Sequence, residues 1–254
     1  MAWYKKTFGK TYLDIYSHRD DTEARKVRNL FELLYSPLVE KKGSQVLCIL
    51  DLCSGQGRYS RVLAQAGHRV VGLDLSEELL REAQSYLEAS PPLPGHIWLV
   101  RADMRRIPFY KKFDLVINMF TSFGYFEEDE ENQKVLDSIK QALKPGGRFL
   151  IDYLNHCAVL KNLVKEDDFQ TNGLSVKQWR TISADGLRVE KKVIVKGPDW
   201  QDRFDESVRL FSKEELENML RGAGLEVDRI FGDYTGAPYT DDSPRLILTG
   251  LNNE

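Results

Sequence analysis

Residues 46–58 read VLCILDLCSGQGR, and this stretch decides the fold class. Its first five residues form a continuous apolar run, as expected of a strand that is buried on both faces of a parallel sheet. The run ends at Asp51 and passes into a turn that contains Gly55 and Gly57. Glycine permits tight turns and a close approach of the backbone to a ligand. We therefore expect a buried strand that leads directly into a ligand-binding loop.

Similar apolar runs alternate with helical patterns along the rest of the chain. Between the runs, apolar residues recur at helical spacing, as Leu79, Ala83 and Leu87 do. This alternation predicts an α/β fold, namely a doubly wound, Rossmann-like, mostly parallel sheet of seven strands with helices on both faces. The expected strands are residues 46–50, 69–74, 97–100, 113–118, 148–153, 225–231 and 245–249.

The alternation stops after the fifth strand. Residues 174–210 contain strand-like segments without a helix between them, and Asp185-Gly186 is a hairpin-type turn signal. These features predict an antiparallel β insert that caps one edge of the core. A capping box at 212–215 then opens the last helix. The predicted organisation is an N-terminal helical lid at 1–42, a cofactor-binding α/β core at 43–155, an antiparallel β cap at 156–210, and a C-terminal completion of the core at 211–254.

Composition and charge limit the function classes. The 254 residues are 42% apolar and 30% charged, with a net charge of −3, which is an ordinary globular composition. No apolar run approaches the ~18 residues of a membrane-spanning helix, and the N-terminus lacks the apolar stretch of a secretory signal. The cysteines and histidines predict neither a disulfide framework nor a metal site. We expect a cytoplasmic protein with a small-molecule partner and without nucleic-acid or membrane partners, because nucleic-acid binding usually requires a basic surface.

Polar side chains follow several of the expected strands. In a doubly wound sheet the ligand lies outside the carboxyl ends of the strands, where the strand order reverses. Asp51, Asp74 and Asp103 come at or just after three such ends, and Asn118 ends the fourth strand. The Asp74 carboxylate can accept hydrogen bonds from the two hydroxyls of an adenosine ribose, each worth roughly 1.5–3 kcal/mol. The pattern predicts a cofactor that contains adenosine.

Two cofactor classes fit this pattern. Gly55, Gly57 and Ser60 nearly match the G-x-G-x-x-G/A fingerprint of dinucleotide binding. S-adenosylmethionine carries the same adenosine, with a cationic sulfonium and an amino-acid tail in place of the pyrophosphate. Asp51 at the entry of the loop favours the cation, because a carboxylate repels a pyrophosphate. An NAD(P)-dependent oxidoreductase and a non-catalytic cofactor-binding module remain alternatives.

A resemblance to a known family favours the second class. Five segments occur in the order and spacing of the class I S-adenosylmethionine-dependent methyltransferases, which this chain resembles from about residue 43 onward. Residues 12–16 and 119–125 resemble a small-molecule branch that includes enzymes that N-methylate amino sugars. The resemblance implies S-adenosyl-L-methionine as cofactor and in-line transfer of its methyl group to a nitrogen or oxygen of a small-molecule acceptor. We expect a monomer or homodimer. The five segments are 46–58, 71–74, 101–104, 113–118 and 144–147.

The resemblance also implies a set of cofactor-binding residues, by matching position. The loop that begins at Asp51 would frame the methionine part of the cofactor, Asp74 would hold the ribose, and the segment at Asp103 would contact the adenine. One departure from the family pattern is Cys53, which stands where the family has the first glycine of the loop. The implied cofactor-binding residues are Tyr12, Tyr16, Asp51, Ser54, Gly55, Gly57, Arg58, Asp74, Leu75, Asp103, Met104 and Asn118.

The candidate catalytic residues are Tyr125, Tyr16 and His156. Methyl transfer from a sulfonium is an in-line displacement, so the protein chiefly aligns the nucleophile and excludes water. Tyr125, on the loop after the fourth strand, would orient the acceptor, with Tyr16 and the candidate base His156 as alternatives. Tyr12 and Tyr16 lie four residues apart, hence on one helix face, and would belong to the lid over the cofactor. The β insert and residues 234–236 would shape the acceptor pocket.

Overall fold

The computed structural model describes residues 3–16, 24, 27–28, 30–34 and 46–253. The predicted lid at 1–42 therefore lies partly outside the described residues. Within the described ranges, no helix is long and apolar enough to cross a membrane.

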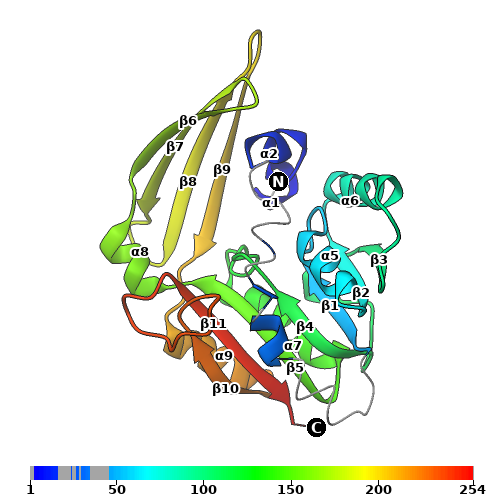
Figure 1. The fold of residues 1–254 in the computed structure, drawn as a ribbon. Coiled ribbons are helices and arrows are strands. Elements are labelled where there is room, and N and C mark those ends of the chain that lie inside the picture. Colours follow the sequence, from blue (N-terminus) through cyan, green and yellow to red (C-terminus); the bar gives the residue numbers. More distant parts are fainter. Residues whose placement is uncertain (1–2, 17–23, 25–26, 29, 35–45, 254) are drawn as a thin grey trace.

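A seven-stranded sheet forms the centre of the molecule (Figure 1). Its strands are β1 (Cys48–Leu52), β2 (Arg69–Asp74), β3 (His96–Arg101), β4 (Phe113–Asn118), β5 (Leu143–Leu154), β10 (Leu225–Phe231) and β11 (Arg245–Asn252). They lie in the order β10-β11-β5-β4-β1-β2-β3. The strands from β5 to β3 pair in parallel, whereas β11 pairs antiparallel with β5 and β10. The predicted doubly wound, mostly parallel architecture is confirmed.

Helices cover both faces of this sheet. They include α5 (Arg58–Gln65), α6 (Glu77–Ala89), α7 (Asp129–Ala142) and α9 (Lys213–Gly222), and the short 3-10 helix η1 (Met104–Arg106) follows β3. Ser76 caps α6 by accepting from the backbone N–H of Leu79, and the predicted capping box of α9 forms between Ser212 and Glu215. Apolar residues of α7 and α9 pack on one face of the sheet and those of α5 on the other, which gives two core layers.

The strand order reverses beside β1. The chain runs from β1 to β2 on one side, whereas β4 pairs with the other side of β1, so that Leu52 is level with Asn118. The loops that follow β1, β2 and β4 therefore diverge from a common edge and leave a crevice between them. This edge is where the predicted ligand-binding residues lie.

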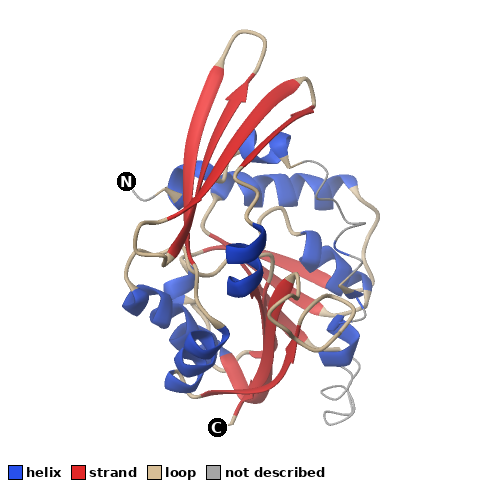
Figure 2. Cartoon of the chain, turned by 90° about the vertical axis from the view of Figure 1, so that its left-hand side faces the viewer, coloured by secondary structure: helices blue, strands red, loops and turns tan. Residues whose placement is uncertain are grey.

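A second sheet stands apart from the first (Figures 1 and 2). Its four antiparallel strands are β6 (Glu166–Thr171), β7 (Leu174–Ile182), β8 (Arg188–Lys196) and β9 (Gln201–Arg209), in that order. The turn at Asp185-Gly186 joins β7 to β8 as expected, and this confirms the antiparallel insert. The insert begins with α8 (His156–Asn162) and β6, which the sequence pattern does not predict, because β6 reads EDDFQT and has one apolar residue.

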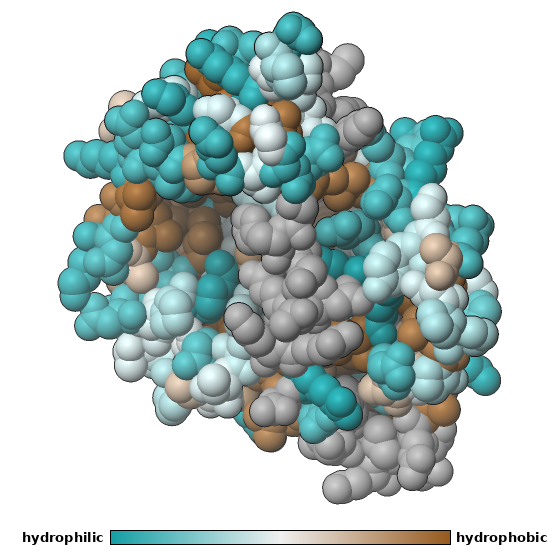
Figure 3. All heavy atoms as spheres, turned by 45° about the horizontal axis from the view of Figure 1, so that its top comes forward, coloured by the Kyte–Doolittle hydropathy of each residue, from teal (hydrophilic) through white to brown (hydrophobic). Residues whose placement is uncertain are grey.

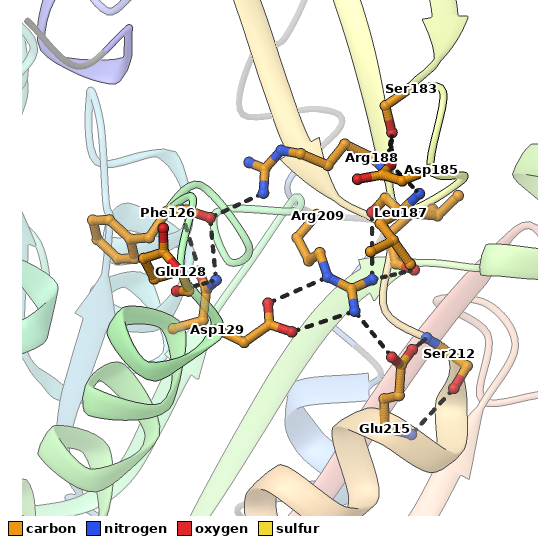
Figure 4. Close-up of polar contacts among 12 residues, drawn as sticks. Phe126, Glu128, Asp129, Ser183, Asp185, Leu187, Arg188, Arg209, Ser212 and Glu215 are labelled. Atoms are coloured by element: carbon orange, nitrogen blue, oxygen red, sulfur yellow. Dashed lines mark hydrogen bonds and ion pairs between the residues drawn. The ribbon is translucent and has the colours of Figure 1, made fainter.

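Two arginines join the base of the four-stranded sheet to the core (Figure 4). Arg209, at the end of β9, donates from Nε to Oδ1 of Asp129 at the start of α7 (3.2 Å) and from Nη2 to Oε1 of Glu215 in α9 (3.0 Å). Arg188, at the start of β8, donates to the carbonyl oxygen of Phe126 (3.0 Å). The two helices and the loop after β4 therefore fix where this sheet stands.

The N-terminal helices lie between the two sheets (Figure 1). They are α1 (Tyr4–Thr7) and α2 (Lys10–Ile15). Ile15 and Tyr16 pack in one apolar cluster with Val193 of the four-stranded sheet. On the opposite side, the hydroxyl of Ser76 donates to the carbonyl oxygen of Phe8 (2.7 Å). These helices bridge the four-stranded sheet and the α/β core beside the crevice.

Candidate active site

One cavity collects most of the predicted site residues. It opens at the carboxyl ends of β1, β2 and β4 and is bordered by α1 and α2. The surface in Figure 3 is hollowed, with apolar residues gathered in the recess and hydrophilic residues around them. The predicted residues that line the cavity are Tyr12, Tyr16, Ser54, Gly55, Arg58, Asp74, Leu75, Asp103, Met104 and Tyr125.

The turn after β1 has a left-handed backbone at three positions. Gly55 and Gly57 have φ angles of 54° and 76°, and Cys53 has a φ of 61°. This conformation costs a residue with a side chain about 1–2 kcal/mol, so Cys53 holds strain where the family pattern has a glycine. The Cys53 sulfur lies 3.4 Å from the sulfur of Met104, whose side chain also lines the cavity. The turn therefore keeps its shape with cysteine in the glycine position.

Asp74, the last residue of β2, ties the glycine turn to α6. Its Oδ2 accepts from the backbone N–H of Gly55 (2.8 Å), and its Oδ1 accepts from that of Ser76 (2.8 Å). Burial raises the pKa of Asp74, against the opposing effect of these hydrogen bonds. Each carboxylate oxygen can accept a further hydrogen bond. Asp74 can therefore bind hydroxyl groups of a ligand without releasing the turn.

Asp51, Gly57 and Asn118 are buried outside the lining of the cavity. The Asp51 carboxyl accepts from the hydroxyl of Ser60 (2.6 Å), and burial raises the pKa of Asp51 to about 6. Asn118 donates to the carbonyl oxygen of Leu52 (3.1 Å) and so joins the ends of β4 and β1. These residues support the turn from behind, and their contact with a cofactor stays a prediction.

Asp103, which caps the start of η1, also lines the cavity. Its carboxylate accepts from the backbone N–H of Arg105 (2.9 Å) and from the guanidinium of the same residue (2.6 Å). Arg105 also pairs with Glu131 of α7, and these acidic partners raise the pKa of Arg105. Leu75 and Met104 supply apolar surface to the same cavity. An oriented carboxylate beside apolar side chains suits a flat, partly polar ring.

A row of aromatic rings forms the wall between the crevice and the N-terminal helices. The ring centroids of Tyr16 and Tyr12 are 4.7 Å apart, and those of Tyr12 and Phe8 are 5.1 Å apart. Phe8 stacks on Tyr125 at 5.7 Å, with 17° between the ring planes. Burial raises the pKa of Tyr125 well above its ordinary value. Tyr125 therefore stays protonated near neutral pH and can donate a hydrogen bond, but it is not available as a phenolate base.

Several lining residues were not assigned from the sequence. The sequence does carry a signal for some of them. The first sixteen residues are rich in aromatic side chains, which indicates Tyr4 and Phe8 as candidates. Met119 and Phe120 directly follow a strand end, which indicates them as well. The unassigned lining residues are Tyr4, Phe8, Leu13, Cys53, Gln56, Tyr59, Ser76, Leu79, Ala102, Met119, Phe120, Ser122 and Phe126.

His156 is not brought to the cavity. It is the first residue of α8, and its Nδ1 lies 3.0 Å from the carbonyl oxygen of Leu210. Residues 234–236, which were expected to shape the acceptor pocket, also lie outside the lining of this cavity. In the part of the chain that the structure describes, no group of three or more histidine, cysteine or acidic side chains is placed to hold a metal ion.

Known proteins match this chain over the site and well beyond it. A family model described as a methyltransferase domain matches residues 49–147. The cypemycin N-terminal methyltransferase of Streptomyces sp is 30% identical over 204 residues, which cover 79% of this chain and 81% of the relative. The dTDP-3-amino-3,4,6-trideoxy-alpha-D-glucopyranose N,N-dimethyltransferase of Streptomyces venezuelae is 27% identical over 205 residues, or 78% of this chain and 84% of the relative.

Solved structures share the fold along nearly the whole chain. The CcbJ methyltransferase from Streptomyces caelestis has a TM-score of 0.81 and 18% identity, over 98% of this chain and 99% of that chain. The sugar N-methyltransferase KedS8 from Streptoalloteichus sp ATCC 53650 has a TM-score of 0.66 and 21% identity, over 97% of this chain and 94% of that chain. At sequence identities this low, the similarity to these two structures shows a shared fold and no more.

Proposed function

Because this chain belongs to the family of S-adenosylmethionine-dependent methyltransferases, we propose that the cavity binds this cofactor and presents its methyl group to a small-molecule acceptor. Family membership decides against the nicotinamide-dependent oxidoreductase that the glycine pattern also allows. We further propose a role for each residue of the cavity and the kind of atom that is methylated.

The side chains that line the cavity fit the proposed cofactor. Ser54 borders the cavity and is buried, with only 8% of the residue exposed. Within the described residues its hydroxyl has no hydrogen-bond partner. A buried hydroxyl without a partner is costly, so a polar ligand group is expected beside it. Asp74 can accept from the ribose hydroxyls while it holds the turn. The Asp74 geometry is the observation that carries the proposal.

The charges near the cavity also suit this cofactor. Asp74 and Asp103 border it and Asp51 lies just behind the turn, which favours a ligand with a sulfonium and an ammonium group. Arg58 lines the cavity at the start of α5, where we propose that it pairs with the carboxylate of the methionine part. Asp103, with Leu75 and Met104, would hold the adenine.

The bound cofactor supplies a methyl group that is already activated by the sulfonium, so the chain has to align the acceptor and exclude water. The aromatic wall of Phe8, Tyr12 and Tyr16 covers the cavity from the N-terminal side. Tyr125 stays protonated, and we propose that its hydroxyl orients the acceptor. We propose the N-terminal helices as a lid and the four-stranded sheet as a cap over the acceptor.

We propose an amino group as the methyl acceptor. The two relatives described above are named for methylation at an N-terminus and at an amino sugar. A neutral amine attacks a methyl sulfonium without prior loss of a proton, so it needs no general base. The absence of His156 from the cavity lining agrees with such an acceptor.

Calorimetry with the full chain tests the cofactor assignment. S-adenosylmethionine and its product S-adenosylhomocysteine should bind with micromolar dissociation constants, and NADH should not bind. Incubation with radiolabelled methyl donor and a panel of matched amines and alcohols then tests the acceptor. Binding of NADH but not of S-adenosylhomocysteine would refute the proposal, and labelling of alcohols alone would refute the amine assignment.

A further inference from the structure

Asp152 is a completely buried carboxylate at the end of β5, outside the lining of the cavity. Three donors from separate segments converge on it. Its Oδ2 accepts from the backbone N–H of Phe120 (2.8 Å) and from the hydroxyl of Tyr234 (2.7 Å). Its Oδ1 accepts from Nε of Arg245 in β11 (2.7 Å). Asp152 thus joins the loop after β4 to the C-terminal part of the sheet.

The loop that Asp152 holds has a strained backbone. Phe120 and Thr121 are consecutive left-handed residues, with φ angles of 60° and 62°, and neither is glycine. Strain of this kind persists only where the surroundings enforce it, and it is concentrated at functional sites. Here the backbone N–H of Thr121 donates to the carbonyl oxygen of Asp152 (3.0 Å), and Arg245 donates to the Thr121 hydroxyl (2.7 Å). Both strained residues are therefore held by Asp152 and its partner Arg245.

The strained pair determines one wall of the cavity. The Phe120 side chain lines the cavity directly after the end of β4. Two guanidinium groups lie near its ring, that of Arg58 at 5.7 Å and that of Arg245 at 5.9 Å from the ring centroid. Arg58 lines the same cavity. A change in the backbone of Phe120 and Thr121 would therefore move Phe120 and remove one of the two rings beside Arg58, the other being that of Tyr59 at 5.5 Å.

We propose that Asp152 is a positioning residue for the methionine half of the cofactor. It holds Phe120 and Thr121 in the left-handed conformation, and Phe120 in turn places Arg58. This inference rests on the proposed function, because it takes the ligand to be S-adenosylmethionine. It predicts an effect on the amino-acid end of the ligand alone, since at the adenosine end Asp74 accepts from Gly55 and Ser76 and Asp103 accepts from Arg105, which belong to other segments than those that meet at Asp152.

The test compares two ligands that share the adenosine ring system and differ at its 5′ carbon, which carries homocysteine in one and a hydroxyl in the other. Asp152→Asn puts an amide nitrogen where a carboxylate oxygen accepts now, so at least one of the three donors loses its acceptor. We expect S-adenosylhomocysteine to bind about tenfold more weakly in calorimetry. Adenosine, which lacks the amino-acid part, should bind as it does to the unaltered chain. Equal weakening of both ligands would show a general structural role and overturn the inference.

A rescue variant separates positioning from simple loss of stability. Glycine adopts the left-handed conformation without strain, so Thr121→Gly removes the strain at one of the two positions that Asp152 holds. The combination of Thr121→Gly with Asp152→Asn should therefore bind S-adenosylhomocysteine more tightly than Asp152→Asn alone. No recovery in the double variant overturns the inference.

Tyr234→Phe keeps the inference open to test if Asp152→Asn does not fold. It removes one of the three donors and should weaken S-adenosylhomocysteine by about threefold, with no change for adenosine. Unchanged affinity for both ligands overturns the inference. Failure of the unaltered chain to bind S-adenosylhomocysteine would instead refute the proposed function, so the two failures are distinguishable.

Discussion

The two sheets of this molecule are built in different ways. In β4 of the seven-stranded sheet all six residues are buried, whereas in β6 of the four-stranded sheet exposed and half-buried residues alternate. The first sheet is a platform with helices on both faces, and the turns at the ends of its strands carry the cofactor cavity. The second is attached at its base through Arg188 and Arg209. Changes at the turns should therefore alter cofactor binding, and changes at the base should alter stability.

Asp74→Ala should have the largest effect on the platform side. It removes the acceptor for the backbone of the glycine turn and for the proposed ribose hydroxyls, each hydrogen bond contributing roughly 1.5–3 kcal/mol. We expect the dissociation constant for S-adenosylhomocysteine to rise at least tenfold in calorimetry. The matched control is Asp205→Ala in β9, an aspartate that is 55% exposed and should leave binding within about twofold. Unchanged binding in Asp74→Ala would contradict the ribose assignment.

Arg209→Ala tests the base of the four-stranded sheet. The arginine side chain is 8% exposed and pairs with Asp129 and Glu215, which are themselves about half exposed. Loss of these hydrogen bonds should lower the free energy of unfolding by about 2–3 kcal/mol, as measured by urea denaturation.

Arg203→Ala is the control for this variant, because Arg203 lies on the same strand, is 58% exposed and pairs with Asp205 at 3.6 Å. It should cost less than about 0.5 kcal/mol. S-adenosylhomocysteine should bind both arginine variants as it binds the original chain. A large loss of affinity in Arg209→Ala would mean that the two sheets do not act separately.

Asp51 lies behind the glycine turn of the platform, and we expect it to make cofactor binding depend on pH. Burial raises the pKa of Asp51 to about 6 in the protein without cofactor, so the carboxyl is neutral below that pH. A cationic ligand favours the anion, and the affinity for S-adenosylmethionine should therefore rise by up to about tenfold between pH 5 and pH 7. The contribution of Asp51 to the free energy of unfolding changes with pH in the opposite direction. The folded chain holds a proton that the unfolded chain releases, so this contribution decreases as the pH rises from about 4 to about 6.

Asp51→Asn cannot titrate at this position and should lose the rise in affinity. Calorimetry at several pH values, with the variant and the original chain in the same buffers, measures the difference. Identical pH profiles for the two proteins would assign the titration to another group and contradict the role given to Asp51.

The platform could be predicted closely from the sequence, because strands that are buried on both faces must be apolar throughout. β2, β4 and β10 begin and end where expected. β5 is longer than expected, since Leu143 already pairs with Phe113 and the turn at 144–147 is drawn into the strand. Gly55 and Asp74 could be singled out because they lie at or within a few residues of a strand end, whereas Ser54 was implied by the resemblance to the family.

The remaining features depend on contacts between distant parts of the chain. Phe8 reaches the cavity because α1 and α2 pack between the two sheets. The role of Asp152 depends on the antiparallel pairing of β5 with β11, which brings Arg245 beside it. No local pattern encodes such contacts. The four-stranded sheet could be predicted in part. Its hairpin turn is a local sequence signal, whereas the charged strand β6 carries no local signal of a strand.

Lys191 tests a polar contact between the four-stranded sheet and a side chain that lines the cavity. Its ammonium pairs with Glu206 on the neighbouring strand (3.5 Å) and donates to the hydroxyl of Tyr16, which lines the cavity. Lys191→Met removes the lysine from a carboxylate that is only 19% exposed, and should lower the free energy of unfolding by about 1 kcal/mol. Adding Glu206→Leu should restore most of that loss, because an apolar pair needs no compensating charge. Affinity for S-adenosylhomocysteine should fall by no more than about twofold, since Tyr16 also packs against Tyr12 and Val193. A tenfold fall would show that the cap controls the cofactor cavity through Tyr16, and the separation of the two sheets would fail at that residue.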